Sequence, residues 1–382
     1  MRWPEVELGA VVKPVSRFEA PLPGTNYRQI GVRLWGGGAY ERETIDGSGT
    51  QYKQLLRVAE SDIVVNKIWA RNGSVAVVTR ELHGCYGSPE FPTFEIDTRR
   101  LLPRWFHWLT KSPTVWRQCD MQSRGTSGKN RLRPEKFLRI KIPLPAPELQ
   151  RQVVTHLDGL SDRIETQKRE REAFDRELNA LLLAAFARVT AGAPYRRMSD
   201  LAPIVRRPVQ IQPDRRYPEL GVRSFGRGVF HKPNLSGSDI TWEKLFAVEQ
   251  GDIVISNIKA WEGAIAVASA ADHGRFGSHR YLTCVPSGLA TPHFLAFYLL
   301  TREGVGKIQA ASPGSADRNR TLGMDALMAI SAPAPPLEKQ RRFEDLLAKV
   351  REVRTLLIDA EAELDALVSS ALNHILTERV KA

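Results

Sequence analysis

The feature that most constrains this chain is an internal repeat at an offset of 190 residues. Three pairs of segments match in this one register: YRQIGVRLWGGGAY at 27–40 with YPELGVRSFGRGVF at 217–230, SDIVVNKIWARNGSVAV at 61–77 with GDIVISNIKAWEGAIAV at 251–267, and HGCYGS at 83–88 with HGRFGS at 273–278. A repeat of this length predicts two copies of one globular module.

Each module is predicted to mix helix and sheet. The β-branched runs at 63–65 and 75–78 flank Asn72-Gly73, which is a strand–turn–strand pattern. Aromatic segments at 105–109 and 294–298 follow prolines and suit short, packed helices. The expected fold class is therefore α+β, with two tandem modules.

A long helix is expected after each module. Proline-rich segments end at Pro147 and Pro336, and residues 148–189 then contain no proline. Apolar residues recur with a seven-residue period, which predicts that the helices pair with each other as an antiparallel coiled coil of pseudo-twofold symmetry. The seam residues expected are Leu157, Ile164, Phe174, Leu178, Leu181, Val350, Val353, Leu357, Leu364 and Leu367.

The alternative is that these are two ordinary core helices. Their length argues against it, because 42 residues at about 1.5 Å each span roughly 60 Å. The predicted segments are a first module at 1–146, a first spacer helix at 147–192, a second module at 193–334 and a second spacer helix at 335–382.

Composition points to a polyanionic partner. The net charge is +12 from 55 Lys and Arg against 43 Asp and Glu, although an arginine-rich composition without such a partner would give the same balance. No apolar run reaches membrane-spanning length, and residues 1–5 lack a secretory apolar core. The three cysteines form no CxxC pair. We expect a cytoplasmic chain without a metal site.

Two modules held by a helical spacer could read the two halves of a split DNA site, and their differing loops would make that site asymmetric. Pro89-Glu90 in the first copy aligns with His279-Arg280 in the second. Lys and Arg suit phosphates, and Arg, Asn and Gln suit base edges. The candidate DNA-binding residues are Arg33, Trp35, Lys67, Arg71, Asn72, Lys129, Asn130, Arg131, Arg223, Lys259, Trp261, Arg275, His279, Arg280, Arg318, Asn319 and Arg320.

No catalytic motif is evident. Gly128-Lys129-Asn130 lacks the hydroxyl residue of a phosphate-binding loop, and the glycines at 36–38 form no GxGxxG. The only Pro-Pro, at 335–336, lacks the flanking residues of an amino-methyltransferase motif. The expectation is a chain that is not an enzyme and needs no cofactor.

The order of motifs resembles the DNA specificity subunits of type I restriction–modification systems. The resemblance rests on the two-copy plan, on the Trp3-x-x-Val6-x-Leu8-Gly9 opening, and on residues 125–130, 140–145 and 148–152. The second copy departs from it at Ser315 and Ala332. The resemblance covers essentially the whole chain, through the order of weak motifs rather than any single one.

That resemblance implies one target-recognition domain per half-site and a role in phage defence. It implies two modification (methyltransferase) subunits as partners, with or without a restriction motor subunit, and places S-adenosylmethionine and ATP on those partners. Two alternatives stay open: a bivalent protein- or RNA-binding adaptor, and a fragment of a fused restriction enzyme.

Overall fold

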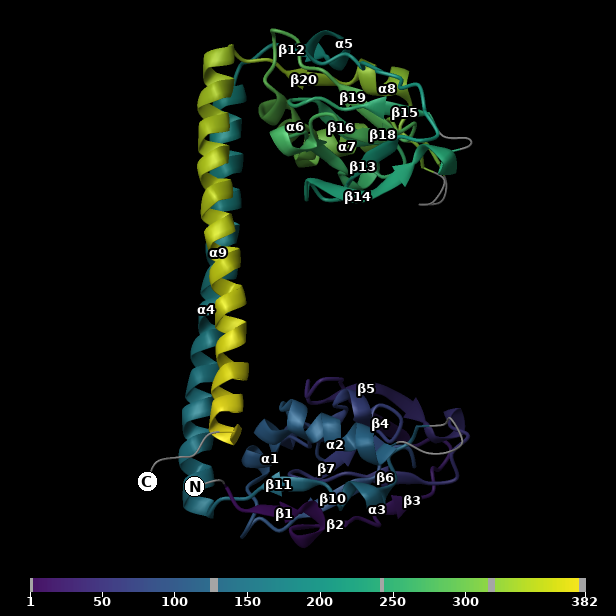
Figure 1. Cartoon of the computed structure of the whole chain (residues 1–382), viewed down its shortest axis with the longest axis vertical. Coiled ribbons are helices and arrows are strands. Elements are labelled where there is room, and N and C mark those ends of the chain that lie inside the picture. The colour runs from purple at the N-terminus through teal and green to yellow at the C-terminus, as the bar shows by residue number, and fades with distance from the viewer. Residues whose placement is uncertain (1–2, 124–129, 241–243, 315–319, 378–382) are drawn as a thin grey trace. The chain divides into compact units, whose positions relative to one another are not determined.

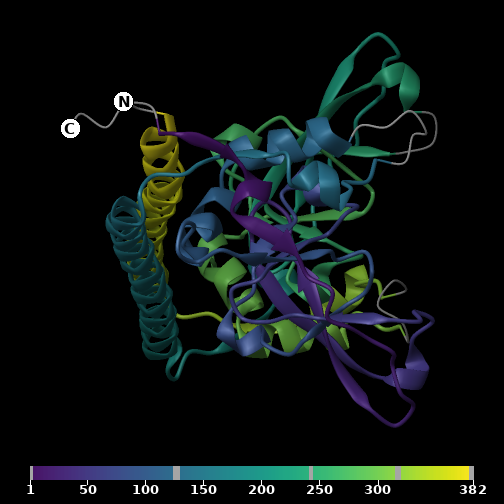
Figure 2. The same ribbon diagram turned by 90° about the horizontal axis from the view of Figure 1, so that it is seen from below.

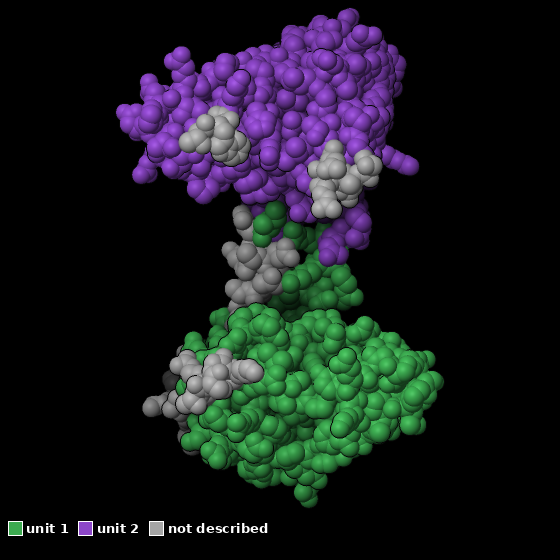
Figure 3. All heavy atoms as spheres, turned by 90° about the vertical axis from the view of Figure 1, so that its right-hand side faces the viewer, with its two compact units in different colours: residues 1–171, 358–382 green, residues 172–357 purple. Residues whose placement is uncertain are grey.

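A computed structural model describes residues 3–123, 130–240, 244–314 and 320–377, apart from the side chains at 359, 361–366, 368–369 and 376–377. The chain divides into unit 1, residues 1–171 with 358–382, and unit 2, residues 172–357 (Figure 3). Each unit thus holds one module and a segment of both long helices. The predicted division separates each module from its spacer helix, whereas these units share the two helices between them. That division stays a prediction.

Unit 1 is built from short strands in three sheets. The strands are β1 (Glu5–Glu7), β2 (Val12–Pro14), β3 (Phe18–Glu19), β4 (Asn26–Val32), β5 (Ala39–Asp46), β6 (Leu55–Arg57), β7 (Ile63–Val65), β8 (Val75–Val77), β9 (Tyr86–Gly87), β10 (Thr93–Ile96) and β11 (Lys141–Pro143). The sheet orders are β3-β6-β9-β4-β5, β2-β10-β7-β8 and β1-β11. Most of these strands are labelled in Figure 1.

Its α-helices begin at prolines, whose missing N–H has no intrahelical partner at that position. They are α1 (Pro103–Thr110), α2 (Pro113–Ser123), α3 (Pro134–Phe137) and α4 (Pro147–Thr190). Short 3₁₀ turns connect the strands: η1 (Leu8–Ala10), η2 (Gly47–Gly49), η3 (Ala70–Asn72) and η4 (Arg80–Leu82). The helix predicted near 105–109 is confirmed as α1.

Both faces of β7 are buried, which explains its unbroken β-branched run. Ile63 and Val65 pack in one cluster with Phe106, while Val64 packs in another with Ile30. Successive side chains of a strand point to opposite faces, so a strand between two apolar layers has no polar position. The predicted strand–turn–strand is confirmed: β7 pairs with β8 antiparallel, and Gly73 between them has a φ of +73°.

Unit 2 repeats this arrangement. Its strands are β12 (Tyr195–Arg197), β13 (Arg216–Val222), β14 (Val229–Ser236), β15 (Leu245–Ala247), β16 (Ile253–Ser256), β17 (Ile265–Val267), β18 (Phe276–Ser278), β19 (Tyr281–Cys284) and β20 (Ser331–Pro333). The sheet orders are β12-β20, β14-β13-β18-β15 and β17-β16-β19. The α-helices and 3₁₀ turns are α5 (Met198–Leu201), α6 (Pro292–Leu300), α7 (Arg302–Ala310), α8 (Met324–Ala329), α9 (Leu337–Thr377), η5 (Gly237–Asp239), η6 (Ala260–Glu262) and η7 (Ala270–Asp272).

The equivalence of the units extends to their irregularities. The long β4–β5 and β13–β14 hairpins (Figure 2) each have one irregular step, at Arg28/Ile30 and at Pro218/Leu220. Each first strand also makes a parallel bridge, Gln29 to Tyr86 and Glu219 to Phe276. These pairs lie about 190 residues apart, so the sequence repeat is a repeat of the fold, and the α+β class is confirmed.

A buried glutamine fastens each long helix to its module. Gln150 Nε2 donates to the carbonyls of Arg100 and Pro145, both at 2.7 Å, and its Oε1 accepts from Leu102 N at 2.8 Å. Gln340 makes the same three bonds, to Leu289 O, Pro335 O and Thr291 N, at 3.0, 2.7 and 2.9 Å. Each glutamine therefore joins its helix start to two other segments of the same unit.

Within each unit, the segments of α4 and α9 pack side by side. In unit 2, Asp175 lies against Arg354, and Phe186 lies against Phe343 with ring centroids 5.4 Å apart, so the two segments run antiparallel. In unit 1, Leu157 of α4 and Leu372 of α9 are buried in one apolar cluster together with Trp108.

The expected seam residues differ in burial between the two heptad positions. Of the expected residues, Leu157, Ile164, Leu178 and Val350 are buried and Leu357 is half-buried, whereas Phe174, Leu181, Val353 and Leu367 are exposed. The side chain of Leu364 lies outside the described residues.

The second seam position follows the first by four residues, not three. Leu182 is buried in place of Leu181, and Arg354 lies in the seam in place of Val353. Arg354 donates to Asp175 Oδ1 at 2.8 Å and to Asn179 Oδ1 at 2.7 Å. Because a helical turn has about 3.6 residues, both spacings look plausible, and a search for apolar residues misses a seam position filled by an ion pair.

Candidate nucleic-acid interface

The loop at the end of the β4–β5 hairpin, residues 33–38, is hydrogen-bonded to the end of η3. Trp35 N donates to Asn72 O at 2.7 Å, and Gly36 N donates to Gly73 O at 3.0 Å. Gly36 has a φ of +69°, and a Cβ there would lie 2.5 Å from the carbonyl oxygen of Thr110. Glycine is therefore required beside Trp35. We call residues 33–38 the tip loop of unit 1.

The tip loop of unit 2, residues 223–228, has the same construction. Phe225 N donates to Glu262 O at 2.8 Å, and Gly226 N donates to Gly263 O at 2.9 Å. Both tip loops thus present an aromatic residue on a backbone held by two hydrogen bonds.

Arg33 and Arg223 enter the tip loops from equivalent positions. The Arg33 guanidinium lies 4.5 Å from the centroid of the Tyr40 ring, and that of Arg223 lies 5.0 Å from the Phe230 ring. These cation–π contacts fix the arginines while leaving them exposed.

Beside the tip loop of unit 1, the structure brings together several predicted residues. The Trp35 ring lies edge-on to Trp116 with centroids 5.4 Å apart. Arg71 and Asn72 are half-buried, and Asn72 Oδ1 is a buried acceptor with no hydrogen-bond partner among the described residues. Trp69, on the neighbouring loop, is exposed.

Lys67 and Arg131 meet at one carboxylate. Lys67 Nζ lies 3.8 Å, and Arg131 Nη1 3.1 Å, from Glu90 Oε1. Glu90 therefore pairs with both cations on this part of unit 1 and offsets one of their two charges. Asn130 is half-buried nearby in sequence, and Lys129 lies outside the described residues.

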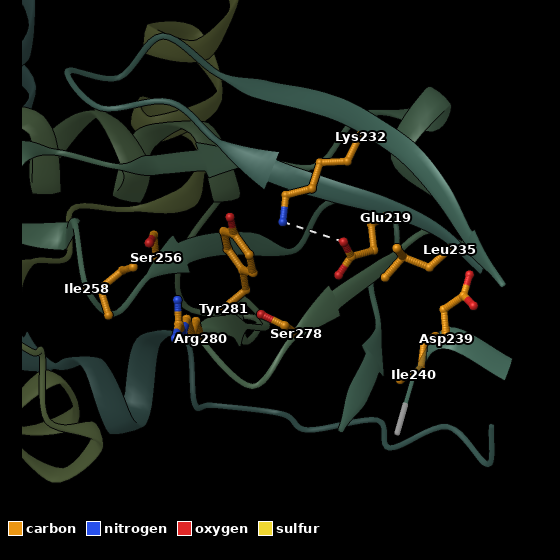
Figure 4. A pocket seen from close by; sticks show the side chains of 10 residues that line it. All are labelled: Glu219, Lys232, Leu235, Asp239, Ile240, Ser256, Ile258, Ser278, Arg280 and Tyr281. Atoms are coloured by element: carbon orange, nitrogen blue, oxygen red, sulfur yellow. Dashed lines mark ion pairs between the residues drawn. The ribbon is translucent and has the colours of Figure 1, made fainter. Parts of the chain in front are cut away.

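Unit 2 has a cavity of about 360 Å³ beside the position equivalent to Glu90 (Figure 4). Its lining is mostly polar: Glu219, Lys232, Leu235, Asp239, Ile240, Ser256, Ile258, Ser278, Arg280 and Tyr281. Lys232 Nζ lies 3.6 Å from Glu219 Oε2 at one end, and Arg280 lies at the other (Figure 4). The cavity thus offers both hydrogen-bond donors and hydrogen-bond acceptors.

Arg280 occupies the place of Glu90 and reverses its charge. Its carbonyl accepts from Asn257 N at 2.8 Å, as that of Glu90 accepts from Lys67 N at 3.0 Å. Among the described residues, its guanidinium pairs with no carboxylate. The arginine is exposed, so it is available to a partner.

Arg275 and His279 differ in their surroundings. Arg275 is half-buried and donates to the carbonyl oxygens of Ala271 and Glu219, at 3.4 and 3.5 Å. His279 is exposed, and its carbonyl accepts from Arg206 at 3.4 Å. His279 is therefore the more accessible of the two predicted residues.

Lys259, Trp261 and Arg320 form one cluster beside η6. Lys259 Nζ and the Arg320 guanidinium lie 5.3 and 5.4 Å from the Trp261 ring centroid. Glu262 accepts from Lys259 Nζ at 2.8 Å and from the Ser224 hydroxyl at 2.8 Å, and these bonds lower its pKa. Arg318 and Asn319 lie outside the described residues.

The sequence alone aligns residues 129–131 with 318–320, and the structure corrects this alignment by one residue. Leu132 N donates to Lys67 O, and Leu322 N donates to Asn257 O, at 2.9 and 2.8 Å. These bonds align the segments at an offset of 190, so Arg320 corresponds to Asn130 and not to Arg131.

Three kinds of residue were missed from sequence. Phe225 was overlooked although the repeat aligns it with Trp35. Arg206, which packs 3.5 Å from the Phe246 ring centroid and donates to Tyr281 O at 2.7 Å, lies in a segment without a clear match. Gln150 was read only as part of a helix start.

No group of three His, Cys, Asp or Glu side chains that could hold a metal lies among the residues described here. All three cysteines are free and buried, and burial raises the pKa of Cys119 and of Cys284 to about 12. Their thiols are therefore protonated at neutral pH. In the described ranges, no helix is long and apolar enough to cross a bilayer.

No model of a known protein family and no curated protein matches the sequence. Solved structures do match. The chain is similar to the HsdS subunit from Thermoanaerobacter tengcongensis at 20% identity and a TM-score of 0.54, over 97% of this chain and 96% of that one.

A second match is a chain from a structure that concerns complex assembly and conformational transition of the type I R-M system. It has 18% identity and a TM-score of 0.68, over 98% and 97% of the two chains. This chain has the HsdS fold. At these identities the likeness covers the fold along essentially the full length of both proteins.

Proposed function

We propose that this chain is the DNA specificity subunit of a type I restriction–modification system. It reads a split, asymmetric site, with one half for each unit, and is itself non-catalytic. The observation that carries the proposal is the likeness to HsdS over the whole chain, which extends to both units rather than to one. The basic net charge of +12 supports a nucleic-acid partner.

Its partners are double-stranded DNA and two methyltransferase subunits, with a restriction motor subunit in systems that cleave. S-adenosylmethionine and ATP bind those partners, and this chain holds no cofactor. The complex acts in the cytoplasm, where phage DNA enters.

The proposed DNA-facing residues are those predicted from the sequence, and three of them, Lys129, Arg318 and Asn319, lie outside the described residues. In unit 1 these are Arg33, Trp35, Lys67, Arg71, Asn72, Lys129, Asn130 and Arg131. In unit 2 they are Arg223, Lys259, Trp261, Arg275, His279, Arg280, Arg318, Asn319 and Arg320. Exposed cations supply phosphate contacts, and the half-buried Asn72 and the exposed Arg280 suit base edges.

The test is a map of methylated adenines in a host that expresses the chain with its methyltransferase subunit. A split motif should appear with the chain and disappear when its gene is deleted. A motif that persists after deletion would refute the proposal. Replacing residues 1–145 with the module of another specificity subunit should change one half-site only.

A bivalent protein- or RNA-binding adaptor predicts a different result. It would leave the methylation map unchanged, and the purified chain would bind duplexes with and without the motif equally. A specificity subunit binds its own duplex more tightly, with an affinity that falls steeply with salt.

A further inference from the structure

Equivalent positions of the two tip loops carry exposed aromatic rings on left-handed backbone. Trp35 has a φ of +57° and is 56% exposed, and Phe225 has a φ of +61° and is 71% exposed. Bulky L-residues rarely adopt this conformation, because the Cβ crowds the backbone. A large ring is also unfavourable in water, so neither property favours stability.

Glycine would remove the strain, and the chain uses glycine nearby. Gly36 and Gly226 are the next residues, and both have positive φ. The one further described non-glycine residue with positive φ is Ser61, and its counterpart in unit 2 is Gly251. At position 61 the units thus differ, whereas at position 35 both keep an aromatic ring.

The backbone hydrogen bonds of the tip loops explain how the strain persists. Trp35 N and Phe225 N each donate to the carbonyl of the last residue of a 3₁₀ turn, at 2.7 and 2.8 Å. A conformation held from outside in this way is over-determined, which is characteristic of binding positions. The ring is consequently presented to solvent on a rigid support.

A cation lies beside one of the two rings. The Arg227 guanidinium lies 5.7 Å from the Phe225 ring centroid, whereas unit 1 has Gly37 at that position, and Arg33 and Arg223 enter the two tip loops. The carboxylate of Glu262, whose carbonyl accepts from Phe225 N, is already engaged by Lys259 and Ser224. An apolar ring on a loop that also carries arginine suits DNA, where the ring meets bases and the cations meet phosphates.

We propose that Trp35 and Phe225 are base-contacting residues, each of which enters a groove of duplex DNA and packs its ring against the bases. This inference rests on the proposed function and identifies how each unit grips its half-site. The rings add apolar contact, and the arginines of the tip loops add charge.

The test uses the full chain with its methyltransferase subunits, and a labelled duplex that carries the motif from the methylation map. Binding is measured over a salt series for Trp35→Gly, for Phe225→Gly, and for Phe174→Ala, an exposed phenylalanine on α4. Each glycine variant should bind about five- to hundredfold more weakly, with an unchanged salt slope, because no phosphate contact is lost. The control should bind as the wild type does.

Stability should move in the opposite direction. Phe225→Gly relieves the left-handed strain and loses little packing, so its Tm should stay level or rise by a few degrees. Phe225→Asn is a second variant, for the case in which glycine loosens the loop. Asparagine tolerates the left-handed backbone but lacks the aromatic ring. Weaker binding in a variant of unchanged Tm supports a direct contact.

The two proposals fail separately. If the map yields a motif and both glycine variants bind its duplex as tightly as the wild type, the base contact is refuted and the specificity function stands. A lower salt slope would assign the loss to phosphate contacts and would also refute it. If deletion of the gene leaves the methylation map unchanged, both proposals fall.

Discussion

Unit 1 and unit 2 hold the same backbone at positions 90 and 280 but place opposite charges on it. In unit 1, Glu90 takes up the charges of Lys67 and Arg131. In unit 2, the equivalent Arg280 has no carboxylate partner among the described residues and lines a cavity. Unit 1 thus pairs its cations with a carboxylate at this position, and unit 2 exposes the cation Arg280.

The same contrast separates framework from surface throughout the repeat. The Arg17–Asp62 ion pair recurs as Arg207–Asp252, and both aspartates are buried. At the surface, however, Trp69 is replaced by Lys259. Duplication therefore keeps the positions of the loops while their side chains diverge, as reading two different half-sites would require.

The largest effects are expected where the units agree. Gln150→Leu removes three hydrogen bonds and leaves Leu102 N and two carbonyls buried without partners. We expect a loss of about 3–5 kcal/mol in the free energy of unfolding. Gln340→Leu should cost unit 2 a similar amount. Urea denaturation measures both.

Gln152→Leu is the control, since Gln152 is exposed on the same helix. A loss below about 1 kcal/mol for both buried glutamines would mean that the helix starts are held by apolar packing instead. A large loss in one unit alone would break the equivalence of the two frameworks.

These glutamines also show what the sequence could reveal. The repeat was legible because framework residues recur, and the buried β-branched runs of β7 and β16 identified their strands. The long helices followed from the absence of proline. Gln150 gives no such signal, because a polar residue in a first helical turn looks like a solvated one, and two of its three partners come from a distant part of the chain.

The candidate interface was less predictable, for two physical reasons. Ion pairs such as Lys67–Glu90 join segments whose proximity only the fold creates. The strain at Phe225 lies in a dihedral angle that residue identity does not disclose. The choice of Val353 for the seam has a similar origin, because Arg354 and Asp175 are compatible with a helix interface only as a pair.

The next largest effect tests the open cation of unit 2. Arg280→Ala should weaken binding of the motif duplex about tenfold and relax specificity in one half-site, because an arginine contact to a base is worth about 1–3 kcal/mol. Binding to duplexes mutated in each half-site measures this. Arg302→Ala, at an exposed arginine on α7, is the control. Equal relaxation of both half-sites would contradict one unit per half.

The larger histidine pH effect should come from unit 1. Burial, aided by the charges of Lys111 and Arg104, lowers the pKa of His107 to about 4. The folded state then binds fewer protons than the unfolded state, so this stability is present above pH 6.5 and is lost as the pH falls toward 4. We expect a loss of about 1–2 kcal/mol between pH 7 and 5.

The control for this effect comes from unit 2. Leu102 and Thr291 donate to the equivalent glutamines, which aligns His107 with Ala296. His107→Ala should therefore flatten the pH dependence of Tm without abolishing it, since burial also lowers the pKa of His293. An unchanged slope would show that His107 stays solvated when folded.

The smallest effect expected is the release of the neutralised cations in unit 1. Glu90→Gln keeps the size of the side chain but frees Lys67 and Arg131, which lie 3.8 and 3.1 Å from its carboxylate. Affinity for a duplex without the motif should rise about threefold, and the salt slope should steepen by about one to two phosphate contacts. Glu95→Gln, which breaks the exposed Lys13–Glu95 pair, is the control. If both variants steepen the slope equally, the effect reflects net charge alone, and Glu90 would not be the residue that sets unit 1 apart from unit 2.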